Sequence, residues 1–339
     1  MGVKRTIKAG LNHILKRHGS EIVLSELLYE WQHSSPDMTP LFNRWMVPEE
    51  AARYLSPENP KLIDLQRRYK SFDPEVTTPF VWTDQHVRPE DIVNFRGDNA
   101  WVWQVRGRNT NILAYALSLY YLKSIDHMGL LDKLTEDDNF GNFSFAIGGR
   151  NVSRDLLDSM TEIYFLDRHL QIASRPDFRV LDIGAGYGRL AYRMTSALPG
   201  LASYTCTDAF AISTFVSEFY LRFRGVEKGH VVPLDEIDET LGNHPVDLAI
   251  NIHSFSECRP QAVEWWVRLL SKHRVKNLMI VPNGEGETST LLTNDGQDFL
   301  PILERYGYRR VVKEPKYLDP LVQEYGLTPS WHHLLELRP

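Results

Sequence analysis

Short apolar runs alternate with segments of helical periodicity through the second half of the chain. Helices are predicted directly after a glycine-rich turn at residue 188 and again at 211–223, 261–270 and 299–306. Apolar strands are predicted at residues 180–183, 204–207, 230–234, 246–252, 277–281, 308–313 and 332–337. Such alternation is typical of an α/β fold in which a mostly parallel sheet carries helices on both faces.

The amino-terminal half follows a different pattern. Helical periodicity is strong at residues 111–128 and 155–172, and a glycine-rich break at 141–150 separates the two segments. Prolines recur between residues 34 and 89, which argues against long helices there. The aromatic residues of this proline-rich segment either clamp it to a neighbouring core or fold it over a pocket as a lid.

Two parts of the chain are therefore expected. Residues 1–175 are predicted to form a largely helical, aromatic-rich cap that contacts a substrate, and residues 176–339 a ligand-binding catalytic domain. Within the cap, residues 3–15 place apolar side chains on one helical face. This stripe predicts docking on the body of the protein or on a partner subunit, which leaves a homo-oligomer open; a membrane-surface helix is the alternative.

Composition narrows the class of protein. The 339 residues are 42% hydrophobic and 24% charged, as in a soluble globular protein, and a formal net charge of −6 argues against nucleic acid as a partner. Two cysteines are too few for a disulfide scaffold or a cysteine-built metal site, so a reducing cytoplasm is predicted. No apolar run reaches the roughly 20 residues that span a bilayer, so no membrane span is expected.

The most informative stretch joins the first strand to its helix. Its turn contains Gly184, Ala185, Gly186, Tyr187 and Gly188. Glycines let backbone amides approach a ligand, and the helix that follows adds partial positive charge. The dinucleotide fingerprint G-x-G-x-x-G is not matched, and Asp182 would lie unfavourably beside a pyrophosphate. A carboxylate favours instead the ammonium and sulfonium of S-adenosyl-L-methionine.

The residues from Val180 to Gly188 resemble the class I S-adenosylmethionine-dependent methyltransferases. This resemblance implies a Rossmann-like fold with a mostly parallel seven-stranded sheet, a glycine turn under S-adenosyl-L-methionine, and Asp182 at the amino-acid end of the cofactor. It also implies that Asp208 takes the ribose hydroxyls, since one carboxylate accepts from two adjacent hydroxyls. Asp235 is expected beside the adenine or as a helix cap, and Asn251 in the same cofactor site.

A second resemblance concerns the acceptor. The stretch from Asp247 to Cys258, together with Asn283 and the aromatic-rich first half, is similar to a bacterial sugar O-methyltransferase family. It implies methylation of a hydroxyl on a sugar or glycosylated small molecule. A sugar hydroxyl is a weak acid, so a base is useful, and His253 is the candidate, with Glu257 orienting it or acting as the base itself.

Substrate contacts are predicted where rings and hydrogen-bonding groups lie together, because sugars stack on aromatic faces and bind polar side chains. The stretch at residues 94–106 has this character, although a buried helix start with paired charges would look the same. The predicted substrate contacts are Arg96, Asp98, Asn99, Trp101, Asn283 and His332.

Other chemistries stay open. A metal-dependent enzyme would need clustered oxygen ligands after the fourth and fifth strands, where the chain offers Asn251, His253, Asn283 and Glu285 without an aspartate cluster. We therefore expect no metal. The alternatives are methyl transfer to carbon or nitrogen, a nicotinamide-dependent oxidoreductase, and a cofactor-binding protein without turnover.

Overall fold

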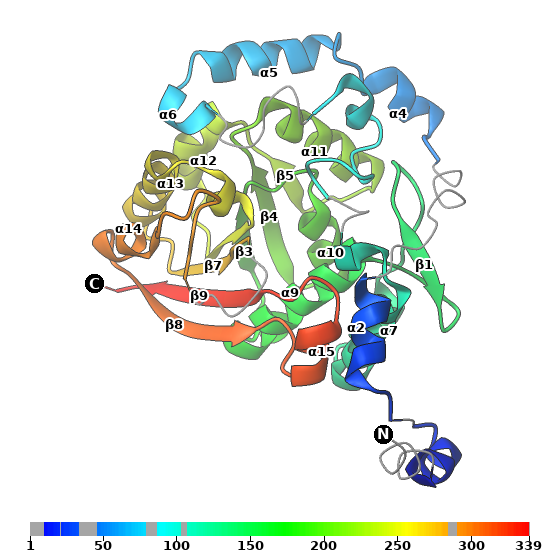
Figure 1. Ribbon diagram of the computed structural model, residues 1–339. Helices are drawn as coiled ribbons and strands as arrows, with labels where there is room; N and C mark the ends of the chain where they lie inside the picture. The colour runs from blue at the N-terminus through cyan, green and yellow to red at the C-terminus, as the bar shows by residue number, and fades with distance from the viewer. Residues whose placement is uncertain are drawn as a thin grey trace.

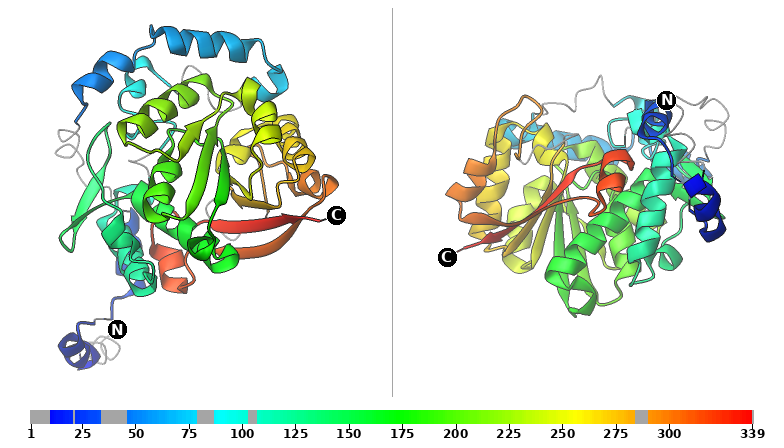
Figure 2. Two further views of the ribbon diagram at one scale, coloured as in Figure 1. Left: turned by 180° about the vertical axis from the view of Figure 1, so that it is seen from behind. Right: turned by 60° about the horizontal axis from the view of Figure 1, so that its bottom comes forward.

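The computed structural model describes residues 10–20, 22–33, 46–78, 87–102, 107–283 and 290–338. A central sheet carries helices on both faces, and the amino-terminal region wraps around one end of it (Figures 1 and 2). Within these ranges no helix is long and apolar enough to cross a membrane.

The sheet has seven strands in the order β5-β4-β3-β6-β7-β9-β8. All neighbours are parallel except β9, which runs antiparallel to both β7 and β8. The strands are β3 (Phe178–Ile183), β4 (Leu201–Thr207), β5 (Gly229–Val231), β6 (Leu248–Ile252), β7 (Asn277–Val281), β8 (Tyr308–Pro315) and β9 (Trp331–Leu337). The predicted Rossmann-like α/β fold, with its mostly parallel seven-stranded sheet, is confirmed.

The helices of this half follow the predicted periodicity, with two short additions. They are α10 (Arg189–Ala197), α11 (Ala211–Phe223), α12 (Ile237–Asn243), α13 (Pro260–Lys272), α14 (Leu300–Arg305) and α15 (Pro320–Tyr325). Helices α12 and α15 were not predicted, because six or seven residues show too little periodicity. The strand predicted at 230–234 ends early, at Val231, and Leu234 begins a 3₁₀ turn after Pro233, which has no amide to donate to the sheet.

The amino-terminal region is largely helical, as predicted. Its helices are α2 (Ser25–His33), α4 (Glu49–Tyr54), α5 (Pro60–Lys70), α6 (Pro74–Thr77), α7 (Ile112–Ile125), α8 (Leu130–Lys133) and α9 (Arg154–Leu170). Among the described residues of the proline-rich segment the longest helix is α5, of 11 residues, and Pro60 is tolerated in its first turn behind the cap of Asn59, where its missing amide costs nothing. The glycine-rich break is a β-hairpin of β1 (Ser144–Ile147) and β2 (Arg150–Ser153), with its turn at Gly148 and Gly149.

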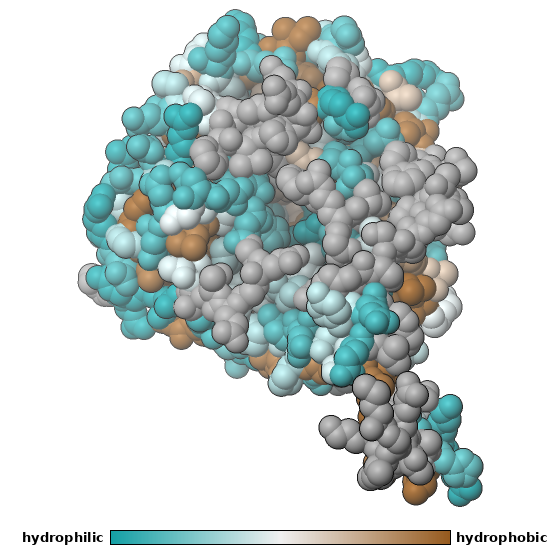
Figure 3. Space-filling model, viewed as in Figure 1, coloured by the Kyte–Doolittle hydropathy of each residue, from teal (hydrophilic) through white to brown (hydrophobic). Residues whose placement is uncertain are grey.

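The extreme amino-terminal segment lies against little of the molecule. Residues 3–9 of the predicted amphipathic helix fall outside the described residues; residues 10–15 are helical and lie away from the body (Figure 1). Leu11 and Ile14 are 46% and 59% exposed, and hydrophobic atoms are visible at this end in Figure 3. Docking of these two side chains on the body is therefore not observed, and docking on a partner subunit stays a prediction.

One hydrophobic core joins the amino-terminal region to the sheet. Phe140, before the hairpin, stacks on Phe95 with ring centroids 4.6 Å apart and meets Phe219 and Phe223 of α11 edge to face. Further out, α5 packs on α11 and α6 on α13. The packing is thus continuous across residue 175, and the division into two parts at that residue stays a prediction.

Buried ion pairs reinforce the same joint. Glu136, 2% exposed, pairs with Arg96 and with Arg193 of α10, and the Arg193 Nη2 to Glu136 Oε2 distance is 2.7 Å. Asp137 pairs with Arg96 at 2.9 Å and with Arg224 at 2.5 Å. The two guanidinium groups hold the pKa of Glu136 below its ordinary value despite the burial that opposes this. The prediction that Arg96 contacts a substrate is wrong, since it is fully buried in this cluster.

We predict that Glu136→Gln destabilises the protein by about 3–5 kcal/mol, because it leaves two buried guanidinium groups short of their counter-charge. Urea unfolding followed by circular dichroism measures the loss. Glu49→Gln is the control: this carboxylate pairs with Arg53 on the surface and its side chain is 83% exposed, so the expected change is within about 0.5 kcal/mol. Equal losses in the two variants would contradict the role assigned to Glu136.

Candidate active site

A cavity of about 610 Å³ lies at the carboxyl ends of β3, β4, β6 and β7, between these strands and the amino-terminal region. This size suits a cofactor or a small molecule, and this edge is where open α/β sheets bind ligands. The strand ends contribute Asp182, Gly184, Ala185, Gly186, Tyr187, Asp208, His253, Glu257 and Asn283. The other walls contribute Val76, Thr77, Trp101, Arg154, Asp158, Lys316, Thr328 and His332, among others.

Backbone conformation and steric contacts restrict the three turn positions to glycine, and the contacts differ from one position to the next. All three have positive φ, at +71° for Gly184, +58° for Gly186 and +84° for Gly188. A Cβ on Gly184 would overlap the side chain of Ser254, so the turns after β3 and β6 touch there. Gly188 begins α10 against Ser217 and does not line the cavity, which corrects the expectation that it contacts the cofactor directly.

Trp101 covers the turn from the amino-terminal side. A Cβ on Gly186 would lie 3.4 Å from Trp101 Cδ1, and the indole Nε1 donates to Ser213 Oγ at 3.0 Å. The backbone amide of Trp101 donates to Asn99 Oδ1 at 2.9 Å. The structure thus brings Trp101 to the cavity, as predicted, whereas Asn99 and Asp98 lie outside its lining and Asn99 holds the loop that carries the indole.

Two carboxyl groups lie at the ends of neighbouring strands. Asp182 is 4% exposed and accepts from Tyr204 Oη at 2.8 Å, and burial raises its pKa to about 7. Asp208 accepts from the amides of Gly186 at 3.1 Å and Phe210 at 2.9 Å, and burial raises its pKa to about 7 as well. Within the described ranges neither carboxyl group forms an ion pair, although the positive charge of Arg189 partly offsets the effect of burial on the pKa of Asp182. A cationic ligand would favour their ionised forms.

His253 leaves β6 with φ +66°, and its amide donates to Val281 O at 2.7 Å. Among the described residues its buried Nδ1 atom has no hydrogen-bond partner. Burial, followed by the positive charge of Arg154, lowers the pKa of His253 to about 3. The imidazole is therefore neutral near pH 7, where it can accept or donate a hydrogen bond but is a weak base.

Glu257 and Asn283 form the wall beside this histidine. Asn283 donates through Nδ2 to Glu257 Oε1 at 2.9 Å, and its amide donates to Ser256 Oγ at 3.0 Å. His332, on β9, also lines the cavity, with its ring edge to face with Phe165, and burial lowers its pKa to about 3. His253, Glu257, Asn283 and His332 thus share one cavity, and their roles stay predictions.

Two predicted cofactor contacts lie elsewhere. Asp235 binds Arg68 of α5 through both oxygens, at 2.8 Å and 2.6 Å, outside the cavity lining, and Pro233 caps the turn instead. The adenine and helix-cap roles of Asp235 are therefore wrong, because α5 covers the end of β5. Asn251 is fully buried; it donates to Ile183 O at 2.9 Å and accepts from Phe255 N at 2.8 Å, bracing the site from behind without lining it.

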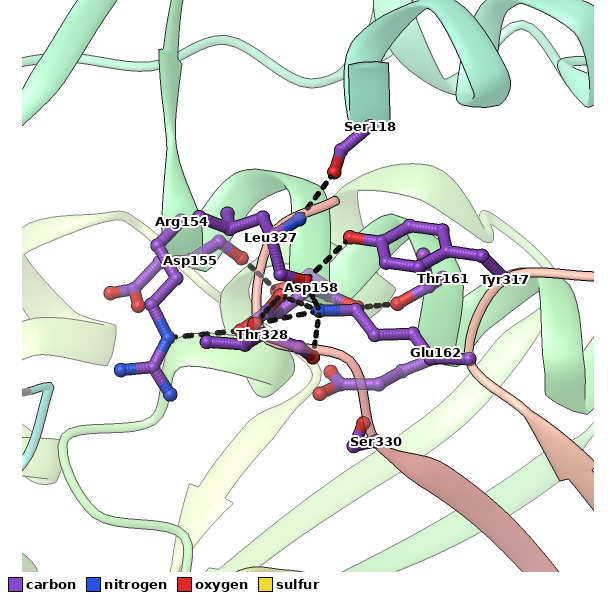
Figure 4. A network of polar contacts seen from close by, with 12 residues as sticks. Ser118, Arg154, Asp155, Asp158, Thr161, Glu162, Tyr317, Leu327, Thr328 and Ser330 are labelled. Carbon is purple, nitrogen blue, oxygen red and sulfur yellow. Dashed lines mark hydrogen bonds and ion pairs between the residues drawn. The ribbon is translucent and has the colours of Figure 1, made fainter. Parts of the chain in front are cut away.

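The charged floor of the cavity was not predicted. It comes mainly from α9, which contributes Arg154, Asp155, Asp158 and Glu162 (Figure 4). Glu162 accepts from both terminal nitrogens of Arg189, at 2.9 Å and 2.8 Å, and Asp155 accepts from Tyr187 Oη. The signal in the sequence that could have predicted this floor is the recurrence of charged residues at helical spacing among the apolar residues of α9.

In the described part of the chain, no group of three or more histidine, cysteine, aspartate or glutamate side chains is arranged to hold a metal ion. Glu285 lies outside the described residues.

Comparison with known proteins gives matches to solved structures alone. No protein-family model and no curated protein matches the sequence. The [4+2]-cyclase SpnF is 14% identical and the match covers 66% of this chain and 95% of SpnF, with a TM-score of 0.40. The magnesium protoporphyrin IX methyltransferase of Synechocystis PCC 6803 with bound SAM is 12% identical over 66% of this chain and 97% of its own, with a TM-score of 0.40. A S-adenosylmethionine-dependent methyltransferase from Clostridium acetobutylicum ATCC 824 is 13% identical over 53% and 91%, with a TM-score of 0.38.

Gly184→Ala is expected to cost more stability than Gly149→Ala. Both residues have positive φ, so each variant loses about 1–2 kcal/mol from left-handed backbone strain. Only Gly184→Ala also drives a methyl group into Ser254, which adds about 1–3 kcal/mol; nothing lies within 4 Å of a Cβ on Gly149. Urea unfolding measures both. Ser254→Gly introduced into Gly184→Ala should remove the extra loss, and no difference between the single variants would refute the contact.

Asp182→Asn is expected to stabilise the ligand-free protein more at pH 8 than at pH 5. The folded carboxyl keeps its proton up to its pKa of about 7, whereas an unfolded aspartate releases it at about 3.9. The free energy of unfolding of the wild type therefore falls as pH rises through this window, and asparagine removes that loss while still accepting from Tyr204. Urea unfolding at the two pH values tests it, with Asp64→Asn at an exposed carboxylate as the control. A variant advantage that shrinks with pH would show the sign to be wrong.

Proposed function

We propose that the protein is an S-adenosyl-L-methionine-dependent methyltransferase that methylates a hydroxyl group of a sugar or glycosylated small molecule. The observation that carries this proposal is the pair Asp182 and Asp208, two carboxyl groups of raised pKa on either side of a glycine turn. Neither carboxyl group forms an ion pair with a described side chain, and a cationic ligand would favour the ionised form of both.

The residues fit the cofactor. Its ammonium and sulfonium groups match the carboxyl groups, while a dinucleotide would bring a pyrophosphate of the wrong charge. Asp208 accepts one amide on each oxygen, so lone pairs remain on both oxygens for a ribose diol. When bound, the cofactor supplies a methyl group on a positively charged sulfur that leaves as a neutral thioether.

The chain's own task is to hold an acceptor hydroxyl in line with that methyl group and to take its proton. Glu257, held by Asn283, is the group proposed to accept the proton. His253 is proposed to orient the hydroxyl through Nδ1, because a pKa of about 3 makes it a poor base. Trp101 offers a ring face and α9 a polar floor, which is the combination that suits a sugar.

Calorimetry tests the cofactor. S-adenosyl-L-methionine should bind, and Asp208→Asn should weaken binding by about tenfold or more, a loss of at least about 1.4 kcal/mol. Asp235→Asn is the matched control, because this carboxylate follows the next strand but pairs with Arg68 outside the cavity; its dissociation constant should equal that of the wild type. Binding of NAD(H) in place of S-adenosyl-L-methionine would end the proposal.

Mass spectrometry of products tests the reaction. A panel of free sugars, glycosides, nucleotide sugars and amine or carbon acceptors should give methylated sugar hydroxyls and S-adenosylhomocysteine. In this assay Glu257→Gln should lower kcat by about 10²–10⁴-fold, the usual contribution of a general base. Methylation of amines or carbon instead would reassign the acceptor, and binding without any product would leave a cofactor-binding protein.

A further inference from the structure

Lys316 is a buried lysine in the wall of the cavity. It is 6% exposed, and its ammonium group lies among several oxygen atoms. It pairs with Asp158 of α9 and donates to Leu327 O at 3.0 Å, Thr328 O at 3.2 Å and Thr328 Oγ1 at 2.9 Å. With its three protons engaged in this way, Lys316 has no donor left for a ligand.

These contacts fix the segment at residues 327–330, which links α15 to β9. Tyr317 Oη also donates to Leu327 O, at 2.9 Å, and the Leu327 amide donates to Ser118 Oγ at 2.9 Å. Thr328 has φ +41°, a left-handed conformation that is unfavourable for a β-branched residue. The segment is thus held by contacts from α7, from α9 and from Lys316. Figure 4 shows Ser118, Asp158, Leu327 and Thr328 in this network.

This segment forms one side of the cavity. Thr328, Pro329 and Ser330 line it together with His332. Arg154, which binds Asp158 through Nε at 3.2 Å, is the charged group that most lowers the pKa of His253, so this wall and His253 face the same space. The pKa of Asp182 responds to Tyr204, Arg189 and Glu162, and that of Asp208 to two backbone amides and to the carboxylates of Asp182 and Glu257. Lys316 belongs to neither set of neighbours.

The charges around this wall are balanced. Asp158 forms ion pairs with Lys316 and Arg154, and Glu162 forms one with Arg189. With Asp155, this wall has three carboxylates and three cationic side chains. Lys316 and Arg154 hold the pKa of Asp158 below its ordinary value although burial opposes this, while burial lowers the pKa of Lys316. A ligand here has no surplus charge to neutralise, which favours an uncharged molecule that makes hydrogen bonds.

We propose that Lys316 is a positioning residue for the methyl acceptor: by tying Thr328 to Asp158 it sets the wall against which an uncharged, polyhydroxylated acceptor lies. The proposal rests on the proposed function and deepens it. Lys316 does not touch the acceptor, so its removal should displace the wall and leave the cofactor end of the cavity as it is.

Steady-state kinetics and calorimetry together test this. Lys316→Met, which keeps the length of the side chain and removes its donors, should raise the acceptor KM by about ten- to a hundredfold. The dissociation constant of S-adenosyl-L-methionine should stay within about twofold, since no cofactor contact is lost. Lys272→Met is the matched control, because this lysine pairs with Asp238 on the surface, and it should change neither value.

Two further variants separate positioning from mere stability. Lys316→Met combined with Asp158→Asn restores the charge balance, so stability should recover while the acceptor KM stays raised. Thr328→Val keeps the β-branched shape and removes one acceptor of Lys316, so it should raise the acceptor KM even if Lys316→Met fails to fold. An unchanged acceptor KM in Thr328→Val and in any folded Lys316 variant, or an equal weakening of cofactor binding, overturns the proposal.

Acceptor charge is tested on the wild type. Neutral sugars should be methylated with a higher kcat/KM than uronic acids or sugar phosphates of the same ring, and the reverse order overturns the assignment of an uncharged acceptor. A wild-type protein that binds no S-adenosyl-L-methionine refutes the proposed function itself, and this inference falls with it. Binding and turnover with unaltered kinetics in the variants refutes the role of Lys316 alone.

Discussion

The carboxylates of α9 impose the constraint on which the site depends. Twelve successive residues of this helix, from Asp155 to Leu166, are buried, and three of them are acidic. A buried carboxylate without a partner is too costly to keep, so each one needs a donor or cation from another element. Tyr187 comes from the glycine turn, Arg189 from the start of α10, and Lys316 from the end of β8. Satisfying α9 therefore draws together the walls of the cavity.

Burial raises the pKa of every buried carboxyl group in this cavity, and the neighbouring side chains decide whether the pKa nevertheless ends below its ordinary value. Asp158 is paired with Lys316 and Arg154 and has a pKa below its ordinary value, whereas Asp182 and Asp208, which form no ion pair among the described residues, have pKa values of about 7. The carboxylate of Asp158, at one end of the cavity, is therefore neutralised by side chains, whereas Asp182 and Asp208, at the other end, are not paired with a described cation. A cationic cofactor beside Asp182 and Asp208 and a neutral acceptor at the end of Asp158 are the pair of ligands that this distribution supports.

The pattern of apolar and polar residues predicted those elements whose formation depends on residues close together in the chain. The strand ends, the glycine turn and α11 depend on residues close in the chain, and their positions follow from periodicity. Local spacing could not predict contacts between residues far apart in the chain. Asp235 pairs with Arg68, which lies 167 residues before it, and Arg96 pairs with Glu136, which lies 40 residues after it. In the sequence both residues resemble ligand contacts, because a charged residue beside a site looks the same whether its partner is a ligand or another side chain. The charged face of α9 was missed for the same reason.

Burial also decides how the proton of the proposed reaction is handled. Burial and the positive charge of Arg154 lower the pKa of His253 and keep its imidazole neutral and weakly basic, and a positively charged ligand in the same cavity would lower this pKa further. The same features leave Nδ1 as a polar atom with hydrogen-bonding capacity in a space of restricted solvent access. An imidazole in that state orients a hydroxyl better than it deprotonates one. The carboxylate of Glu257, held by Asn283 on the adjoining turn, then remains as the group that can take the proton as the methyl group is transferred.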